Sequence, residues 1–218
     1  MPRLNFHNSL KELQQQILAM GGLVEESIAN SIKSLAEQNV ELAQKVIDGD
    51  DKIDELELEI EDQCLKLIAT QQPIAKDLRK IATGLKIISD LERMADHAVD
   101  ISRVAKRLAD EPLIKPLIDI PRMADLAQKM VKDSLDAYVN EDLDTARSLA
   151  NDDDQVDHLH SQIFRELLTF MMEDPKTIKQ ATQLLFVSRY LERIADLSTN
   201  IGEAVIYLVT GERQDLND

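Results

Sequence analysis

The feature that most constrains this chain is an internal repeat. Leu91 to Ile101 reads LERMADHAVDI, and Leu191 to Ile201 reads LERIADLSTNI, with six of the eleven positions identical. Upstream, the acidic stretch 151–157 repeats 48–54 at an offset of 103, while the LER stretches are 100 apart. Repetition over such a length indicates one structural unit used twice. The change of offset must fall near Pro73 and Pro175, where a loop tolerates lost residues.

The composition favours helices. Aromatic residues make up only 3% of the chain, and there are six glycines and no tryptophan, which leaves little material for sheets. Apolar residues recur every three or four positions over about 4–38, 41–72 and 74–109, as on the buried face of an amphipathic helix. We therefore expect an all-α protein, with Gly21-Gly22 marking close helix packing and the DGDD sequence at 48–51 as a possible loop.

Three prolines divide the chain. Pro112, Pro116 and Pro121 fall within 111–121, which we predict to be a linker. The first repeat then covers 1–110 and the second covers 122–218. Each repeat has room for three antiparallel helices, so the predicted fold is two tandem, pseudo-symmetric three-helix bundles.

Net charge narrows the range of partners. The chain carries a formal charge of −16, which counts against nucleic acid, an anionic lipid surface or a free phosphate-type anion as the main ligand. Cations, or a protein with a basic surface, suit it better. The N-terminus lacks an apolar signal segment, which points to the cytoplasm. Cys64, the single cysteine, lies on an apolar helix face, so we expect a buried packing residue.

Acidic residues form facing stripes in the first repeat. Four acids on the second helix and three on the third recur at steps of three or four residues, which places each set on one side of its helix. Antiparallel neighbours would bring the two rows together, and like charges repel unless a cation lies between them. This pattern predicts a metal site with oxygen ligands. The two stripes are Asp50, Asp54, Glu57 and Glu61, and Glu92, Asp96 and Asp100.

The second repeat keeps the pattern with changes. Asn200 replaces Asp100 and His160 replaces Glu57, which lowers the charge and alters the metal preference. His158 and His160 are spaced to join a transition-metal site, or are simply polar surface residues, and His97 points away from its stripe. The alternative for both repeats is a solvated acidic face offset by basic neighbours, namely Arg79, Lys80, Arg93 and Arg193.

No catalytic pattern stands out. The sequence shows no nucleophile–base pair, no phosphate-cradling glycine loop and no cofactor fingerprint, so we expect no enzyme. Two alternatives remain open. One is a metal-free helical adaptor, and the other is a carboxylate-bridged di-metal enzyme, which lacks the paired ExxH spacing usual for such sites.

Taken together, the paired LERxAD motifs, the QQPIAKDLRKI stretch from Gln71 to Ile81 and the duplicated layout resemble the PhoU family of phosphate-uptake regulators. The resemblance covers essentially the whole chain. It implies a DxxxD-type motif pair in each bundle that holds metal in some members, with Asn200 as a departure and the two LER glutamates as additional ligands. The implied metal ligands are Asp50, Asp54, Glu92, Asp96, Asp100, Asp153, Asp157, Glu192, Asp196 and Asn200.

The same resemblance implies a function. We expect a cytoplasmic, homodimeric negative regulator that restrains phosphate import and represses the phosphate-starvation response. It would contact a phosphate ABC transporter and a sensor histidine kinase, without inserting into the membrane. The implied cofactor is a divalent or trivalent metal ion, such as iron, zinc, manganese, magnesium or calcium. Both high-affinity and low-affinity phosphate carriers remain possible targets.

Overall fold

All regular structure in the described part of the chain is helical. The computed structural model describes residues 2–216, with side chains from Phe6 to Leu216, and this part contains no strand. The prediction of an all-α fold with two three-helix bundles is confirmed. The elements are α1 (Pro2–Ala36), α2 (Val40–Gln71), α3 (Lys76–Leu108), α4 (Asp119–Asn140), α5 (Leu143–Glu173), the short 3-10 helix η1 (Pro175–Thr177) and α6 (Ile178–Thr210).

The first turn of each bundle has the same design, at an offset of 103. Gln38 and Glu141 take left-handed backbone angles, with φ of 50° and 53°, and end the preceding helix. Asn39 then caps α2, because its side chain accepts a hydrogen bond of 2.9 Å from the Leu42 N–H. Asp142 caps α5 in the same way, because its Oδ1 accepts a hydrogen bond of 3.2 Å from the Thr145 N–H, and it also accepts one of 2.9 Å from the Asp144 N–H. The repeat therefore extends to the chemistry of the caps.

The second helix of the first bundle is continuous. Residues 48–51, a possible loop in the sequence, lie inside α2, and Gly49 is exposed there. The helix ends where Gln72 adopts a left-handed conformation (φ 46°) directly before Pro73. Proline cannot donate the next backbone hydrogen bond, which explains the end of the helix at this point.

The segment between the bundles is slightly shorter than the predicted linker 111–121. Helix α4 already begins at Asp119, so Pro121 lies in its first turn, where a missing N–H is tolerated. Side chains from both bundles hold the first half of the segment. Gln38 Nε2 donates to the Leu108 carbonyl at 2.6 Å, and Gln180 Nε2 donates to the Pro112 carbonyl at 3.1 Å.

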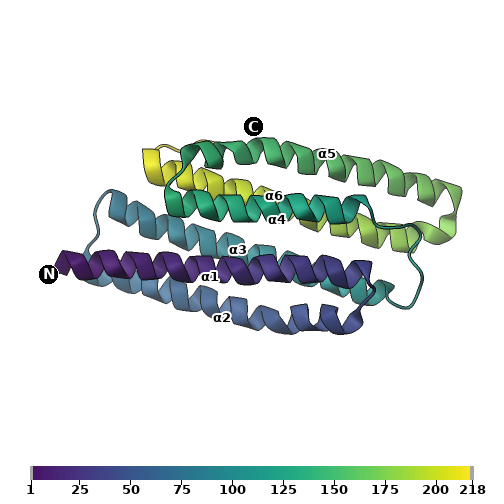
Figure 1. The fold of residues 1–218 in the computed structure, drawn as a ribbon, viewed down its shortest axis with the longest axis horizontal. Coiled ribbons are helices and arrows are strands. Elements are labelled where there is room, and N and C mark those ends of the chain that lie inside the picture. Colours follow the sequence, from purple (N-terminus) through teal and green to yellow (C-terminus); the bar gives the residue numbers. More distant parts are fainter. Residues whose placement is uncertain (1, 217–218) are drawn as a thin grey trace.

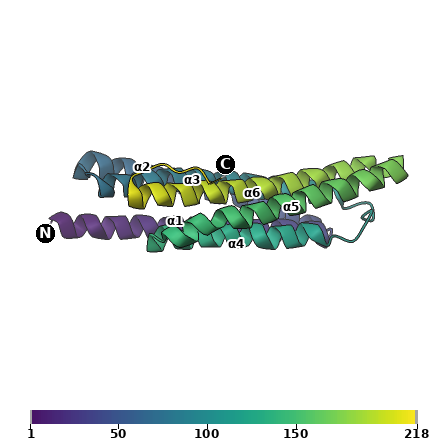
Figure 2. The ribbon, with the colours of Figure 1, turned by 90° about the horizontal axis from the view of Figure 1, so that it is seen from above.

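Helices α3 and α6 lie side by side where the two bundles meet (Figure 1, Figure 2). They run antiparallel, because Arg79 Nε donates to the Leu208 carbonyl at 3.2 Å while Arg107 contacts Gln183 at the other end. The bundles also meet along α1 and α4, whereas α2 and α5 each pack only within their own bundle. The two copies of the LER motif therefore lie side by side and point in opposite directions.

Close packing joins the bundles. A Cβ on Gly21 would collide with Leu135 of α4, so this glycine allows α1 and α4 to approach closely, whereas Gly22 meets no neighbour. The prediction of close packing thus holds for Gly21 alone.

Cys64 is fully buried, as predicted. Burial raises the pKa of its thiol to about 11, which keeps the sulfur protonated and unreactive.

Candidate functional site

The acidic stripes of the first bundle meet where α2 and α3 pack together. Burial raises the pKa of Asp50 to about 6, and Asp54 and Asp96 add to the effect. The pKa of Glu92 rises to about 7, from burial first, then from Asp96 on the same helix and Glu57 on α2. Carboxylates on both helices therefore lie in one another's electric field. The neighbouring negative charges add to burial in suppressing ionisation of Asp50 and Glu92, as closely spaced like charges do.

Asp100 stands apart from this cluster. Its Oδ1 accepts a hydrogen bond from Arg103 at 2.9 Å, and its charge acts on His97 and Tyr190 instead. Helical geometry explains the departure, since each step of four residues rotates a stripe by about 40°. Two such steps from Glu92 carry Asp100 away from α2 and toward α6.

The second bundle has a matching cluster between α5 and α6. Asp153 is buried, and its pKa rises to about 7 through burial, Asp196 and Asp157. Its Oδ1 has no hydrogen-bond partner in the structure. Burial, Glu192 and Asp196 likewise raise the pKa of Asp157. A buried carboxylate oxygen without a partner is costly, so this position favours either a proton or a cation.

Two histidines, His160 and His97, lie in different environments. His160 lies at the edge of the second cluster, where it lowers the pKa of Asp157, and its Nδ1 is 3.0 Å from the Ser188 Oγ. His97 does not join a cluster, in agreement with its position on the helix. Its ring stacks on Tyr190, with 5.7 Å between the ring centroids, and burial lowers its pKa.

Arginines form ion pairs with two acids of the second cluster. Arg193 pairs with Asp196 at 3.0 Å, and Arg189 pairs with Glu192. Asn200 is half-buried one turn beyond Asp196. As the side chains stand, no three His, Cys, Asp or Glu groups within residues 6–216 converge closely enough to hold one ion. The donor chemistry suits a hard cation, and binding one would require the arginines to release their carboxylates.

Asp90 is a functional candidate that the stripe pattern missed. It is 5% exposed on α3, its Oδ2 has no partner, and burial raises its pKa to about 6. Lys86 and Arg93 lower this pKa, while Glu203 of α6 raises it. A signal existed in the sequence, because Asp90 stands three residues after Ile87 and four before Met94, on the apolar face of the helix.

Comparison with known proteins identifies the family to which both bundles belong. The profile of the PhoU domain matches residues 17–105 and 120–205, one match for each bundle. The phosphate-specific transport system accessory protein PhoU homolog of Clostridium acetobutylicum is 47% identical over 100% of both chains. Within residues 2–216, no helix has an apolar stretch sufficient to cross a membrane.

Solved structures agree with this relationship. The crystal structure of PhoU from Pseudomonas aeruginosa matches with a TM-score of 0.91 and 38% identity, over 95% of this chain and 100% of that one. The phosphate transport system regulatory protein PhoU from Streptococcus pneumoniae matches with a TM-score of 0.89 and 33% identity, over 96% and 99% of the two chains.

Proposed function

Because the chain belongs to the PhoU family, we propose that it is an accessory regulator of phosphate uptake that acts through protein contacts. The observation that carries this proposal is the family match in both bundles, with a relative named for phosphate-specific transport aligned over its full length. The fold supports a contact role, since packed helices hold a cluster of acidic residues in each bundle, between α2 and α3 and between α5 and α6.

The finer proposal concerns the direction of control. The protein acts in the cytoplasm, as a homodimer, to restrain phosphate import and repress the phosphate-starvation response. It does so by relaying the state of a phosphate ABC transporter to a sensor histidine kinase. The acidic surface supports this idea, because a chain of net charge −16 complements basic surfaces on partner proteins.

Metal binding is the second part of the proposal. Burial first, and neighbouring carboxylates second, raise the pKa values of Glu92 and Asp153 to about 7, which supports a position that favours a bound proton or cation. A divalent or trivalent cation would replace the protons and supply a positive centre that ties neighbouring helices, or a partner, together. All-oxygen ligands suit magnesium, calcium, manganese or iron, and His160 adds a nitrogen that suits zinc or iron.

Elemental analysis tests the metal proposal. The full chain, purified without a metal-affinity tag, is compared with the Asp96→Ala, Asp196→Ala double variant, which removes one acid from each cluster. We expect metal in the native protein and its loss in the variant. The control is Glu55→Ala, Glu59→Ala, because both residues are exposed on α2 outside the stripe. Equal metal content in the native and double-variant proteins would refute the site.

Partner binding is tested separately. Affinity purification of the full chain from phosphate-replete cells, followed by mass spectrometry, should recover transporter and sensor-kinase components. Recovery of neither would overturn the proposed relay from transporter to kinase.

A metal-free adaptor is a second candidate function, favoured by the absence of an assembled ligand set within residues 6–216. Unchanged partner binding by protein stripped of metal would favour that adaptor.

A further inference from the structure

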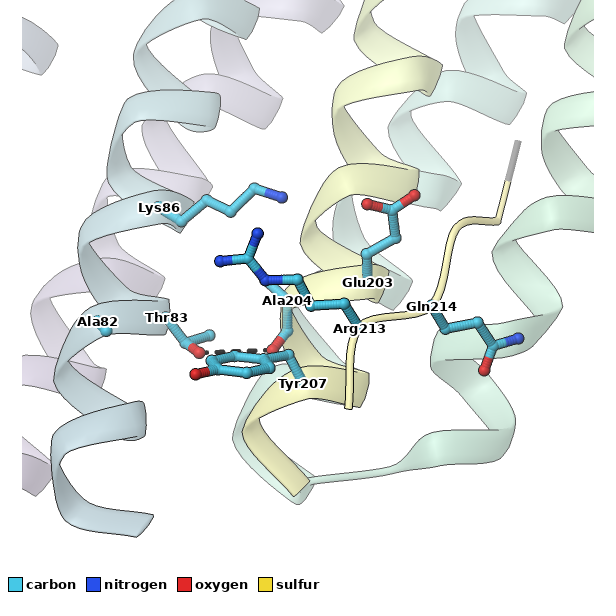
Figure 3. A pocket seen from close by; sticks show the side chains of 8 residues that line it. All are labelled: Ala82, Thr83, Lys86, Glu203, Ala204, Tyr207, Arg213 and Gln214. Carbon is cyan, nitrogen blue, oxygen red and sulfur yellow. Dashed lines mark hydrogen bonds between the residues drawn. The ribbon is translucent and has the colours of Figure 1, made fainter. Parts of the chain in front are cut away.

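A cavity of about 460 Å³ opens between the bundles, away from both carboxylate clusters. It lies between α3 and α6 and is bordered by the segment that follows α6 (Figure 3). Its volume is within the range of small-molecule sites and exceeds the size of a single small ion. The lining residues are Ala82, Thr83, Lys86, Glu203, Ala204, Tyr207, Arg213 and Gln214.

Two cations reach into this cavity from different elements. Lys86 comes from α3 in the first bundle, and Arg213 comes from the segment after α6 in the second (Figure 3). Neither forms an ion pair within residues 6–216. The charge of Lys86 lowers the pKa of Asp90 and of Glu203, but neither carboxylate forms a close ion pair with it. The ammonium and the guanidinium thus remain available as donors to a ligand in the cavity.

The remaining polar groups suit an oxygen-rich ligand. The Arg213 guanidinium lies 5.8 Å from the centroid of the Tyr207 ring, and this cation–π contact holds it at the cavity. Thr83 Oγ1 borders the same space and donates a long hydrogen bond of 3.4 Å to the Ala204 carbonyl. A guanidinium, an ammonium and hydroxyl groups are the donors with which proteins bind phosphates and carboxylates.

Glu203 is the one carboxylate among the lining residues, and the backbone of the C-terminal segment engages it. The Leu216 N–H donates to Glu203 Oε1 at 3.1 Å. Burial raises the pKa of Glu203, although the Leu216 bond and Lys86 lower it. Gly211, with φ of 79°, turns the chain back at the end of α6 so that this segment can run along the helix. The carboxylate thus helps to fix the segment that carries Arg213.

We propose that this cavity binds a small polyanion, a metabolite bearing phosphate or carboxylate groups, between Lys86 and Arg213. Such a ligand would bridge α3, α6 and the C-terminal segment, and would therefore link the two bundles. The net charge of the chain argues against anions in general. Repulsion from acids farther away than about 8 Å is largely screened at physiological ionic strength. Glu203 and Asp90 are nearer and also feel the charge of Lys86, so a bound anion would compete with these two carboxylates for the lysine.

Isothermal titration calorimetry tests the proposal on the full chain. The protein is first passed over a chelating resin, so that an anion cannot bind through a metal. Pyrophosphate, inorganic phosphate and citrate are then titrated at about 0.15 M salt. We expect saturable binding of at least one polyanion. Preference for pyrophosphate would identify a phosphorylated ligand, and preference for citrate a polycarboxylate. Binding of none of the three would overturn the proposal.

Variants locate the site. Lys86→Ala and Arg213→Ala should each weaken binding about tenfold or more, because each removes a charged hydrogen-bond donor. Lys179→Ala and Arg147→Ala remove exposed cations elsewhere and should leave the affinity unchanged. Glu203→Gln should tighten binding, whereas Glu55→Gln on exposed α2 should not. Circular dichroism melting confirms that each variant folds, and equal affinity of the native, Lys86→Ala and Arg213→Ala proteins would refute the site.

Discussion

Single acidic residues in this chain differ sharply in environment despite similar sequence surroundings. Asp153 is buried with an unpartnered oxygen, whereas Asp100 pairs with Arg103. The stripe periodicity identified both as site residues, because it reports only which side of a helix they occupy. It could not show that Asp100 has rotated toward α6, or that Asp90 on the apolar face has become a buried acid. Those properties depend on which helix packs alongside.

Asp90 provides a pH prediction. Its pKa of about 6 in the folded protein exceeds the ordinary value of 3.8, so the stability that its carboxyl group contributes is present below about pH 4 and is lost as the pH rises through about 6. Asp90→Asn removes the buried charge but keeps the shape. We expect the variant to gain about 1–2 kcal/mol of unfolding free energy at pH 8, with little gain at pH 4.

Urea denaturation at both pH values measures this effect. Asp110→Asn, at an exposed position in the turn after α3, is the control and should change little at either pH. If Asp90→Asn raised the free energy of unfolding no more at pH 8 than at pH 4, burial of the ionised carboxylate would not destabilise the protein. The buried environment assigned to Asp90 would then be wrong.

At the scale of helices, the sequence predicted the main elements and the duplication of their pattern. The sequence left open whether 48–51 is a loop, and in the structure α2 is unbroken there. What the pattern left open was the role of each glycine, because a helix accommodates glycine whether the reason is close packing or chance. Gly202 and Gly49 illustrate the two cases, since only the first has near neighbours.

These two glycines give opposite predictions. A Cβ at Gly202 would lie 2.8 Å from Leu149 Cδ1 and 3.0 Å from the Ala146 carbonyl oxygen, so Gly202→Ala should cost about 1–3 kcal/mol through overpacking. Gly49→Ala meets no atom within 4 Å and should add about 0.5–1 kcal/mol by reducing backbone freedom in the unfolded chain. Thermal melts of both variants measure these effects, and a shift of the same sign in both would contradict the packing described.

At the scale of the whole molecule, the duplication was readable in the sequence, but the joining of the halves was not. Nothing in the spacing of LERMAD and LERIAD shows that α3 and α6 lie antiparallel, or that Leu135 reaches Gly21 across the α1–α4 contact. The cavity beside Lys86 was equally invisible, because residues from α3, α6 and the C-terminal segment must first come together to form it.

The shared interface predicts cooperative unfolding of the two bundles. Natural probes exist for each half, since Cys64 is the single cysteine and lies in α2, while all three tyrosines lie in α4 and α6. In a urea titration, the exposure of the Cys64 thiol to a thiol reagent and the change in tyrosine fluorescence should share one midpoint. Two separate midpoints would show that the bundles unfold independently.

The antiparallel pairing of α3 and α6 has a consequence for recognition. Because the repeated motif appears twice and points in opposite directions, a partner with its own two-fold axis could bind both copies at once. An asymmetric partner could instead bind in two nearly equivalent orientations, related by a rotation of about 180°. Sequence differences between the repeats would then make the two orientations unequal in binding energy. Examples are Asn200 in place of Asp100 and Tyr190 in place of Asp90.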